Sequence, residues 1–167
     1  MSFSLLPTWM AGEITQLKPS FLLEQGVRLV MLDFDNTIIP YTTNEPPPEV
    51  LAWMEDMYGA GLRLCVVSNS HNSRVPDFCE KYGLDCVTHA KKPFSRGIKE
   101  CLARYDIPPR ESVLIGDQIY TDTLGGNCAG VRTVLVRSIN NHTFWLKLRH
   151  VAEMPFILFA KNRRIKE

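Results

Sequence analysis

The 167-residue chain lacks several features that mark whole classes of protein. No apolar run approaches the roughly 20 residues that a membrane-spanning helix needs. The N-terminal stretch MSFSLLPTWMAGE has neither the basic start and long apolar core of a secretory signal nor the arginines of a transit peptide. Internal repeats and low-complexity tracts are missing as well. We therefore expect a cytoplasmic globular protein.

Cysteine is present without any pattern of pairing. The chain shows no CxxC pair and no histidine spacing typical of zinc, and its cysteines are odd in number: Cys65, Cys79, Cys86, Cys101 and Cys128. Most of them fall within apolar stretches. Buried free thiols in a reducing compartment fit this distribution better than disulfides do.

The chain also lacks an excess of charge of one sign, because 19 basic side chains stand against 18 acidic ones. Residues 142–167 nevertheless carry six basic groups (Lys147, Arg149, Lys161, Arg163, Arg164 and Lys166) against two acidic ones. The remaining 141 residues carry 13 basic and 16 acidic groups. Whole-molecule charge thus indicates no partner, but the C-terminal segment is distinctly basic.

Apolar residues accompany this basic segment, namely Phe144, Trp145, Leu146, Leu148, Phe156, Ile157 and Phe159. Such a mixture is typical of a segment that lies on an anionic membrane surface. The N-terminal segment likewise spaces apolar residues as a helix would: Leu5, Leu6, Trp9, Met10, Ile14 and Leu17. The alternative is that both segments are packing helices that cover a sheet and end in a solvated basic tail, and both descriptions can hold together.

What the chain does contain is a regular alternation of strand-like and helix-like segments. Strands are predicted at 27–34, 62–69, 84–89, 111–117 and 131–137, with helical patterns between them at 44–61, 73–83, 93–109 and 121–129. This alternation favours parallel pairing, and hence an α/β fold with a doubly wound parallel sheet. The length suits a single domain over 1–167, with flanking segments at 1–26 and 142–167.

Polar side chains gather where four of these strands end: Asp33 and Asp35, Ser68 and Asn69, Lys91 and Lys92, and Asp117 and Asp122. In doubly wound sheets, ligands bind outside the carboxyl ends of the strands. Several carboxylates at one sheet edge need a cation, and Mg²⁺ prefers such hard oxygen ligands. A lysine and a Ser–Asn pair suit a phosphate dianion. The pattern therefore predicts phosphoryl transfer through an aspartyl-phosphate.

The motifs DFDNT (33–37), SN (68–69), KKP (91–93) and GDQIYTD (116–122), in this order, resemble those of the haloacid dehalogenase (HAD) superfamily. The resemblance implies a Rossmann-like core in which Asp33 is the nucleophile and Asp35 the general acid and base. It implies that Ser68 and Lys92 contact the transferring phosphoryl group. Thr37 and Asn69 join these two as phosphate-binding residues. The implied Mg²⁺ ligands are the Asp33 carboxylate, the Asp35 backbone carbonyl, Asp117 and Asp122.

Two residue assignments keep an alternative. Lys91 could replace Lys92 as the active-site lysine, although the family's lysine usually stands directly before proline, which favours Lys92. His71 and Arg74 follow Ser68 closely and could touch the substrate, but surface or helix-capping roles are favoured for both.

The spacing of the motifs leaves no room for an inserted cap domain. Positions 34–67 and 69–91, which separate Asp33, Ser68 and Lys92, are filled by helix and strand patterns. An open site can meet a phosphate presented on something large, such as a protein, a nucleic-acid end or a lipid headgroup.

Longer stretches resemble one branch of the superfamily, the subfamily IIIA phosphatases that include phosphatidylglycerophosphate phosphatase. They are LKPSFLLEQGVRLVMLDFDNT, SNSHNSRV, AKKP, GDQIYTD and FWLKLRHVAE. The resemblance implies dephosphorylation of phosphatidylglycerophosphate to phosphatidylglycerol by an enzyme peripheral to the inner face of the membrane. Another exposed phosphate, on a phosphoprotein or a nucleic-acid 3′ end, is the alternative, and the core shows no basic groove for nucleic acid. A noncatalytic binding module is disfavoured because Asp33 and Asp35 are both present.

Overall fold

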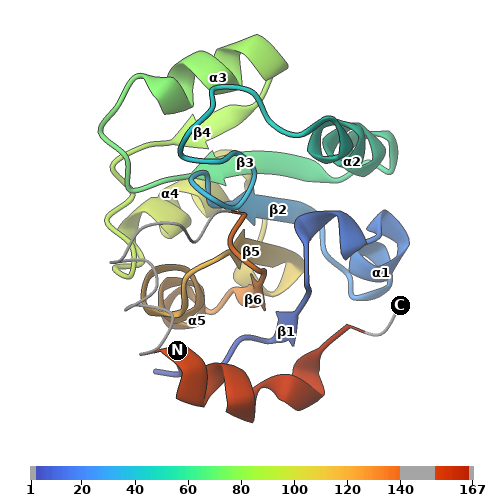
Figure 1. Ribbon diagram of the computed structural model, residues 1–167, viewed down its shortest axis with the longest axis vertical. Coiled ribbons are helices and arrows are strands. Elements are labelled where there is room, and N and C mark those ends of the chain that lie inside the picture. The colour runs from blue at the N-terminus through green and yellow to red at the C-terminus, as the bar shows by residue number, and fades with distance from the viewer. Residues whose placement is uncertain (1–2, 140–152, 166–167) are drawn as a thin grey trace.

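The computed structural model describes residues 3–139 and 153–165. Within these ranges, six strands form one parallel sheet in the order β1-β6-β5-β2-β3-β4 (Figure 1). The strands are β1 (Trp9–Met10), β2 (Leu29–Leu32), β3 (Arg63–Val67), β4 (Asp85–Val87), β5 (Ser112–Gly116) and β6 (Arg132–Leu135). The prediction of a doubly wound α/β sheet without an inserted cap domain is confirmed.

Helices cover the sheet on both faces, which explains why the central strands are mostly apolar. On one face, Val30 and Leu32 of β2 share a core with α1 (Pro19–Glu24), α2 (Pro48–Gly59) and α3 (Arg74–Tyr82). On the other face, Leu29 and Met31 pack with α4 (Arg96–Tyr105) and α5 (Leu124–Ala129). All four β2 side chains are fully buried, so the strand that carries Asp33 is the best-anchored element of the fold.

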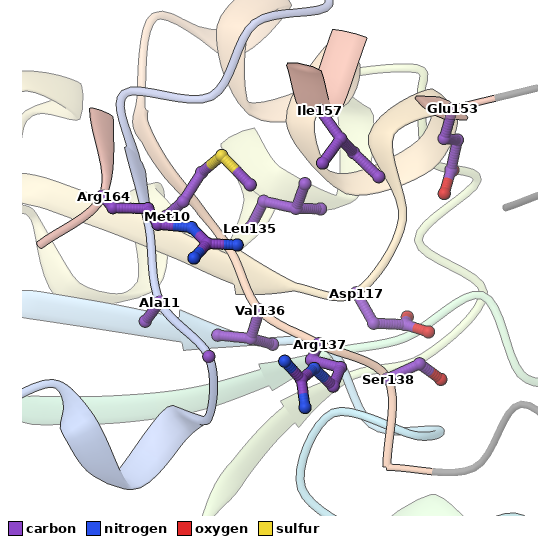
Figure 2. Close-up of a pocket in the computed structure, with 11 residues that line it drawn as sticks. Met10, Ala11, Asp117, Leu135, Val136, Arg137, Ser138, Glu153, Ile157 and Arg164 are labelled. Carbon is purple, nitrogen blue, oxygen red and sulfur yellow. The ribbon is translucent and has the colours of Figure 1, made fainter. Parts of the chain in front are cut away.

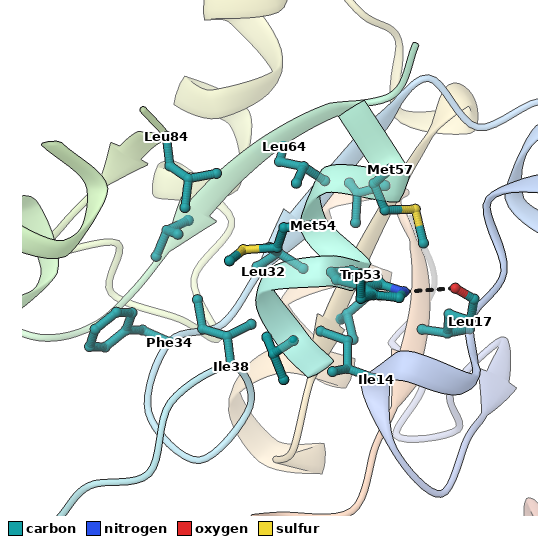
Figure 3. Close-up of a cluster of buried hydrophobic side chains, with 14 of the residues drawn as sticks. Ile14, Leu17, Leu32, Phe34, Ile38, Trp53, Met54, Met57, Leu64 and Leu84 are labelled. Carbon is teal, nitrogen blue, oxygen red and sulfur yellow. Dashed lines mark hydrogen bonds between the residues drawn. The ribbon is translucent and has the colours of Figure 1, made fainter. Parts of the chain in front are cut away.

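Helix α2 ties the N-terminal segment to the core (Figure 3). Its buried residues recur at helical spacing, as the sequence predicts: Val50, Trp53, Met54 and Met57. The indole Nε1 of Trp53 donates a hydrogen bond of 2.7 Å to the backbone carbonyl of Leu17, whose side chain is fully buried. A buried indole N–H needs such a partner, so this bond fixes the path of the chain before β2.

The start of the chain differs from the helix that its apolar spacing predicts. Trp9 and Met10 form an edge strand that pairs with β6, and a short 3₁₀ turn, η1 (Ile14–Gln16), follows. Thr8 and Thr133 brace the pair, since the backbone N–H of each donates a hydrogen bond of 3.1 Å to the hydroxyl of the other. The helical expectation was wrong here because a two-residue strand is too short to show a period.

The end of the described chain contains a helix over residues 153–159 and a 3₁₀ turn, η4 (Lys161–Arg163). Arg164 then forms a parallel bridge with Met10, beside β1. Several residues of the predicted membrane-surface segment lie outside the described ranges: Phe144, Trp145, Leu146, Lys147, Leu148, Arg149 and Lys166. No helix in the described parts of the chain is long and apolar enough to cross a membrane.

Candidate active site

The polar residues predicted at the strand ends meet at one edge of the sheet. Backbone hydrogen bonds continue past the strands and place them there. Asp33 N–H donates to the carbonyl of Ile115 at 2.9 Å, and Ser68 N–H donates to that of Val87 at 3.0 Å. A cavity of about 390 Å³ opens at this edge and is bordered by Asp33, Asp35, Tyr41, Ser68, Asn69, Arg74 and Lys92, among others.

Lys92, rather than Lys91, points into the site. Its Nζ lies 2.6 Å from Oδ1 of Asp33 and 2.7 Å from Oδ1 of Asp122, and only 1% of its side chain is exposed. Lys91 is exposed to solvent. Burial disfavours the charged ammonium, but the carboxylates of Asp122 and Asp33 outweigh that effect and raise the pKa of Lys92. Lys92 therefore stays cationic beside the predicted nucleophile.

Asn69 holds Lys92 in place through the backbone. Its Nδ2 donates to the Lys92 carbonyl at 2.9 Å, and its Oδ1 accepts from the Lys92 N–H at 2.7 Å. These two bonds join the ends of β3 and β4. The predicted contact of Asn69 with phosphate remains a prediction, and the structure adds a positioning role that the sequence did not reveal.

Ser68 and Thr37 are two further buried hydroxyl residues at the site. The Ser68 hydroxyl is buried at the border of the cavity and accepts the N–H of Ser70 at 3.0 Å. Thr37 Oγ1 is 3.3 Å from Oδ2 of Asp33, and the residue is 1% exposed. Thr37 thus orients the carboxylate of Asp33, and its predicted contact with phosphate remains untested.

Three buried carboxylates form a cluster that fits a cation. One oxygen each of Asp33, Asp117 and Asp122 lies within 4.8 Å of the other two. With Asp35 included, four carboxylates face two cations, Lys92 and Arg74, which leaves a formal charge of −2. A divalent ion balances this charge, and Mg²⁺ accepts such an arrangement of hard oxygen ligands. The donor set therefore fits the predicted Mg²⁺.

Asp122 comes from an irregular turn that brings it back toward β5. After the strand, the chain makes a π-helical turn, η3 (Ile119–Thr123), and Gln118 N–H donates to Oδ2 of Asp122 at 3.2 Å. Burial raises the pKa of Asp122 to about 7 in the absence of metal, against the opposing effect of Lys92. Because burying an ionised carboxylate costs free energy, its position here is consistent with a site that binds a cation.

Asp35 is not one of these three clustered carboxylates and pairs with Arg74. The Arg74 Nη1 lies 2.6 Å from Oδ1 of Asp35, while Nη2 donates to the carbonyls of Pro40 and Thr43. Burial raises the pKa of Asp35, and Arg74 opposes this rise. The sequence favoured a surface or capping role for Arg74, because nothing in it could show a contact between residues 39 positions apart.

Comparison with known proteins places this site in a family. Residues 89–152 match a family model described as HAD-hydrolase-like. Over 131 residues the chain is 32% identical to the Bacillus subtilis (strain 168) protein "Probable phosphatase YqeG", an alignment that covers 78% of this chain and 76% of that protein.

Solved structures of low sequence identity share the fold. A HAD superfamily (subfamily III A) hydrolase from Legionella pneumophila aligns with a TM-score of 0.52 at 12% identity, over 89% of this chain and 97% of that one. The cobalt-bound deoxy-D-mannose-octulosonate 8-phosphate phosphatase from Haemophilus influenzae aligns with a TM-score of 0.54 at 8% identity, over 82% and 91% of the two chains. The identity and coverage of the Bacillus subtilis match, with the matching family model, show that the chain belongs to the HAD-like phosphatase family.

Proposed function

We propose that the protein is a Mg²⁺-dependent phosphatase that works through an aspartyl-phosphate, and that its substrate is phosphatidylglycerophosphate. The main support for this chemistry is the buried contact of Lys92 with both Asp33 and Asp122. It lies beside the cluster of Asp33, Asp117 and Asp122, which fits a divalent cation. It offers a nucleophile, a fixed positive charge and a place for a divalent ion within one small volume.

In the first step, a carboxylate oxygen of Asp33 attacks the phosphorus of the substrate and the bond to the leaving oxygen breaks. Lys92 and the Ser68 hydroxyl stabilise the negative charge on the transferring phosphoryl group. Asp35 gives its proton to the leaving oxygen, a role favoured by the burial that raises its pKa. The product alcohol departs, and Asp33 is left phosphorylated.

In the second step, Asp35 is ionised and takes a proton from a water molecule. The water oxygen attacks phosphorus and the bond to Asp33 breaks, which releases inorganic phosphate and restores the carboxylate. The guanidinium of Arg74 holds the Asp35 carboxylate in one orientation through both steps. Mg²⁺ held by Asp33, Asp117 and Asp122 supplies neutralisation of the phosphate charge when it is bound.

The surface near the C-terminus supports a lipid substrate. On the helix at 153–159, Met154, Leu158 and Phe159 are 40%, 50% and 80% exposed. Arg163 and Arg164 follow directly and are exposed as well. Exposed apolar side chains beside guanidiniums favour docking to an anionic membrane surface, and we place the enzyme at the inner face of the membrane.

A substrate panel tests the proposal. Phosphate release with Mg²⁺ should be fastest for phosphatidylglycerophosphate and slower for a sugar phosphate, a nucleotide, a 3′-phosphorylated oligonucleotide and a phosphopeptide. Asp33→Asn should lower turnover by about 10⁴-fold or more, because an amide does not attack phosphorus. Asp56→Asn, an exposed carboxylate on α2, is the matched control and should leave turnover unchanged.

If the wild type hydrolyses a soluble phosphate ester faster than the lipid, the lipid is not the substrate, although the protein is still a phosphatase. Full activity of Asp33→Asn would instead remove the covalent mechanism.

A further inference from the structure

A second cavity, of about 210 Å³, borders the carboxylate cluster on the side of β1 and β6 (Figure 2). Asp117 lines it, and Gln118, the next residue, lines the cavity that contains Asp33. Because Asp117 belongs to the same carboxylate cluster as Asp33, the second cavity lies next to the predicted metal site. None of the roles assigned so far uses this cavity.

Two guanidiniums line this second cavity, from Arg137 after β6 and from Arg164 beside β1. Among the described residues, neither side chain forms a salt bridge, whereas Arg28, Arg74 and Arg104 each pair with a carboxylate. Arg137 also borders two further hollows around residue 12, so its guanidinium is accessible. Two arginines available beside a phosphatase centre suit a second anionic group on the substrate.

The rest of the lining combines apolar side chains from β1, β6 and the C-terminal helix (Met10, Leu135, Val136 and Ile157) with Ser138 and the carboxylates of Asp117 and Glu153. The Glu153 carboxylate is buried, and its Oε1 accepts the N–H of Ile119 at 3.0 Å. A nucleic acid would present a chain of charged phosphates and stacked bases, for which this lining offers no aromatic surface. One phosphodiester followed by the start of a lipid glycerol matches two guanidiniums next to aliphatic side chains.

We propose that Arg137 and Arg164 bind the internal phosphodiester of a glycerophospholipid substrate while its terminal phosphate lies at Asp33. The inference deepens the proposed function and rests on it: the protein selects lipids that carry a phosphate monoester and a phosphodiester joined by a short linker. The aliphatic side of the cavity receives the glycerol carbons next to the acyl chains. The exposed residues Leu158 and Phe159 lie on the helix that supplies Ile157, so the acyl chains leave the cavity toward the membrane-docking surface.

The test compares two substrates that differ in the phosphodiester. One is short-chain phosphatidylglycerophosphate, used below its micelle-forming concentration so that membrane docking plays no part. The other is glycerol 3-phosphate, which carries the monoester alone. Arg137→Gln should lower kcat/KM for the lipid about 10-fold or more, mainly through KM, and should change kcat/KM for glycerol 3-phosphate less than about twofold. Arg164→Gln should act in the same direction.

Arg63→Gln is the matched control, because Arg63 is exposed at the start of β3, at the opposite end of the strands from the site. It should alter neither substrate. An equal loss for both substrates in Arg137→Gln, or no loss for either, would overturn the subsite. A larger effect of Arg137→Gln on a 3′-phosphorylated oligonucleotide than on the lipid would overturn the choice of a lipid phosphodiester.

A second measurement separates this inference from the proposed function. Glycerophosphoglycerol carries the phosphodiester and no monoester, and it should inhibit hydrolysis of p-nitrophenyl phosphate competitively. The inhibition constant should rise about 10-fold in Arg137→Gln. If the wild type fails to hydrolyse the lipid, the proposed substrate is wrong, whereas absence of inhibition in the wild type shows that the subsite itself is wrong.

Discussion

Asp33 and Asp35 are only two positions apart, but each pairs with a different basic residue that lies far away in the sequence. Asp33 contacts Lys92 and lies within 4.8 Å of carboxylate oxygens of Asp117 and Asp122, while Asp35 pairs with Arg74. Separate environments suit the different roles proposed for the two carboxylates, nucleophile for Asp33 and proton donor and acceptor for Asp35. The DFDNT motif could predict both aspartates, but the cation assigned to each depends on the fold.

Arg74 gives a prediction on pH. Burial raises the pKa of Asp35, and Arg74 holds it below the value that burial alone would set. Arg74→Gln should therefore raise this pKa further. In the proposed mechanism the second step needs ionised Asp35, so the acidic limb of the kcat profile should move to higher pH. Arg74→Lys should restore part of the wild-type profile.

The profile is measured with a small soluble ester, and far-ultraviolet circular dichroism checks that each variant is folded. An acidic limb that stays in place in Arg74→Gln would show that Asp35 is not the group that sets it.

The carboxylate cluster gives a prediction on metal. EDTA should abolish turnover, and added Mg²⁺ should restore it better than Ca²⁺, whose looser coordination fixes in-line attack poorly. Asp117→Asn should raise the Mg²⁺ concentration needed for half-maximal rate. Turnover that persists in EDTA would contradict the assignment of Asp33, Asp117 and Asp122 to a metal site.

At the scale of elements, the end of β5 is the tightest point of the site. Gly116 closes the strand, and a Cβ there would lie 2.3 Å from Cγ and Oδ2 of Asp122. Nothing larger than a hydrogen fits while the π-helical turn returns Asp122 to the cluster. A helix that began regularly after β5 would carry this carboxylate elsewhere.

Gly116→Ala should therefore displace Asp122, lower the free energy of unfolding by about 1–3 kcal/mol and weaken Mg²⁺ activation. Gly59→Ala is the matched control, because no atom lies within 4 Å of its added Cβ in α2. That variant should be as stable as the wild type or slightly more so. Chemical denaturation and a Mg²⁺ titration measure both effects; wild-type Mg²⁺ activation in Gly116→Ala would contradict the close-packing argument.

The elements show why some predictions from sequence hold and others fail. Strands β2, β3, β5 and β6 were predictable because most of their side chains are buried on both faces, and the resulting apolar runs are bounded by turn residues. The edge strand β4, in which Asp85 is exposed, is shorter than the predicted strand at 84–89. Strand β1 was not predictable, since two residues carry no period. The contact of Asp35 with Arg74 and the clamp of Asn69 on Lys92 join different loops, and local sequence holds no record of such pairings.

At the scale of the whole molecule, the exposed residues Leu158, Phe159 and Arg163 belong to the same C-terminal segment as Ile157 and Arg164, which line the second cavity. If this segment docks to membranes, replacing Leu158 and Phe159 together by Ser should reduce sedimentation with anionic vesicles and lower turnover of vesicle-borne lipid. Activity on a soluble ester should remain, because both side chains are exposed and outside the site.

Leu23→Ser, an exposed leucine of α1 at 45%, serves as the control and should sediment like the wild type. Binding should also weaken as salt rises, because each exposed basic group contributes on the order of 1 kcal/mol through a screened interaction. Equal sedimentation of the double variant and the wild type would remove the docking argument.

The two-residue strand β1 also bears on the order in which the chain assembles. Hydrogen bonds join Thr8 next to this strand to Thr133, and the Met10 carbonyl accepts the N–H of Ile165. These contacts can form only after almost the entire chain has been synthesised. Long loops delay closure, whereas β2 and β3 meet across far fewer residues. We expect the amides of Ala11 and Ile165 to exchange with deuterium faster than that of Met31 in the folded protein. Asp33 would then follow a strand that forms early in folding, whereas the cavity lined by Arg137 and Arg164 would form late.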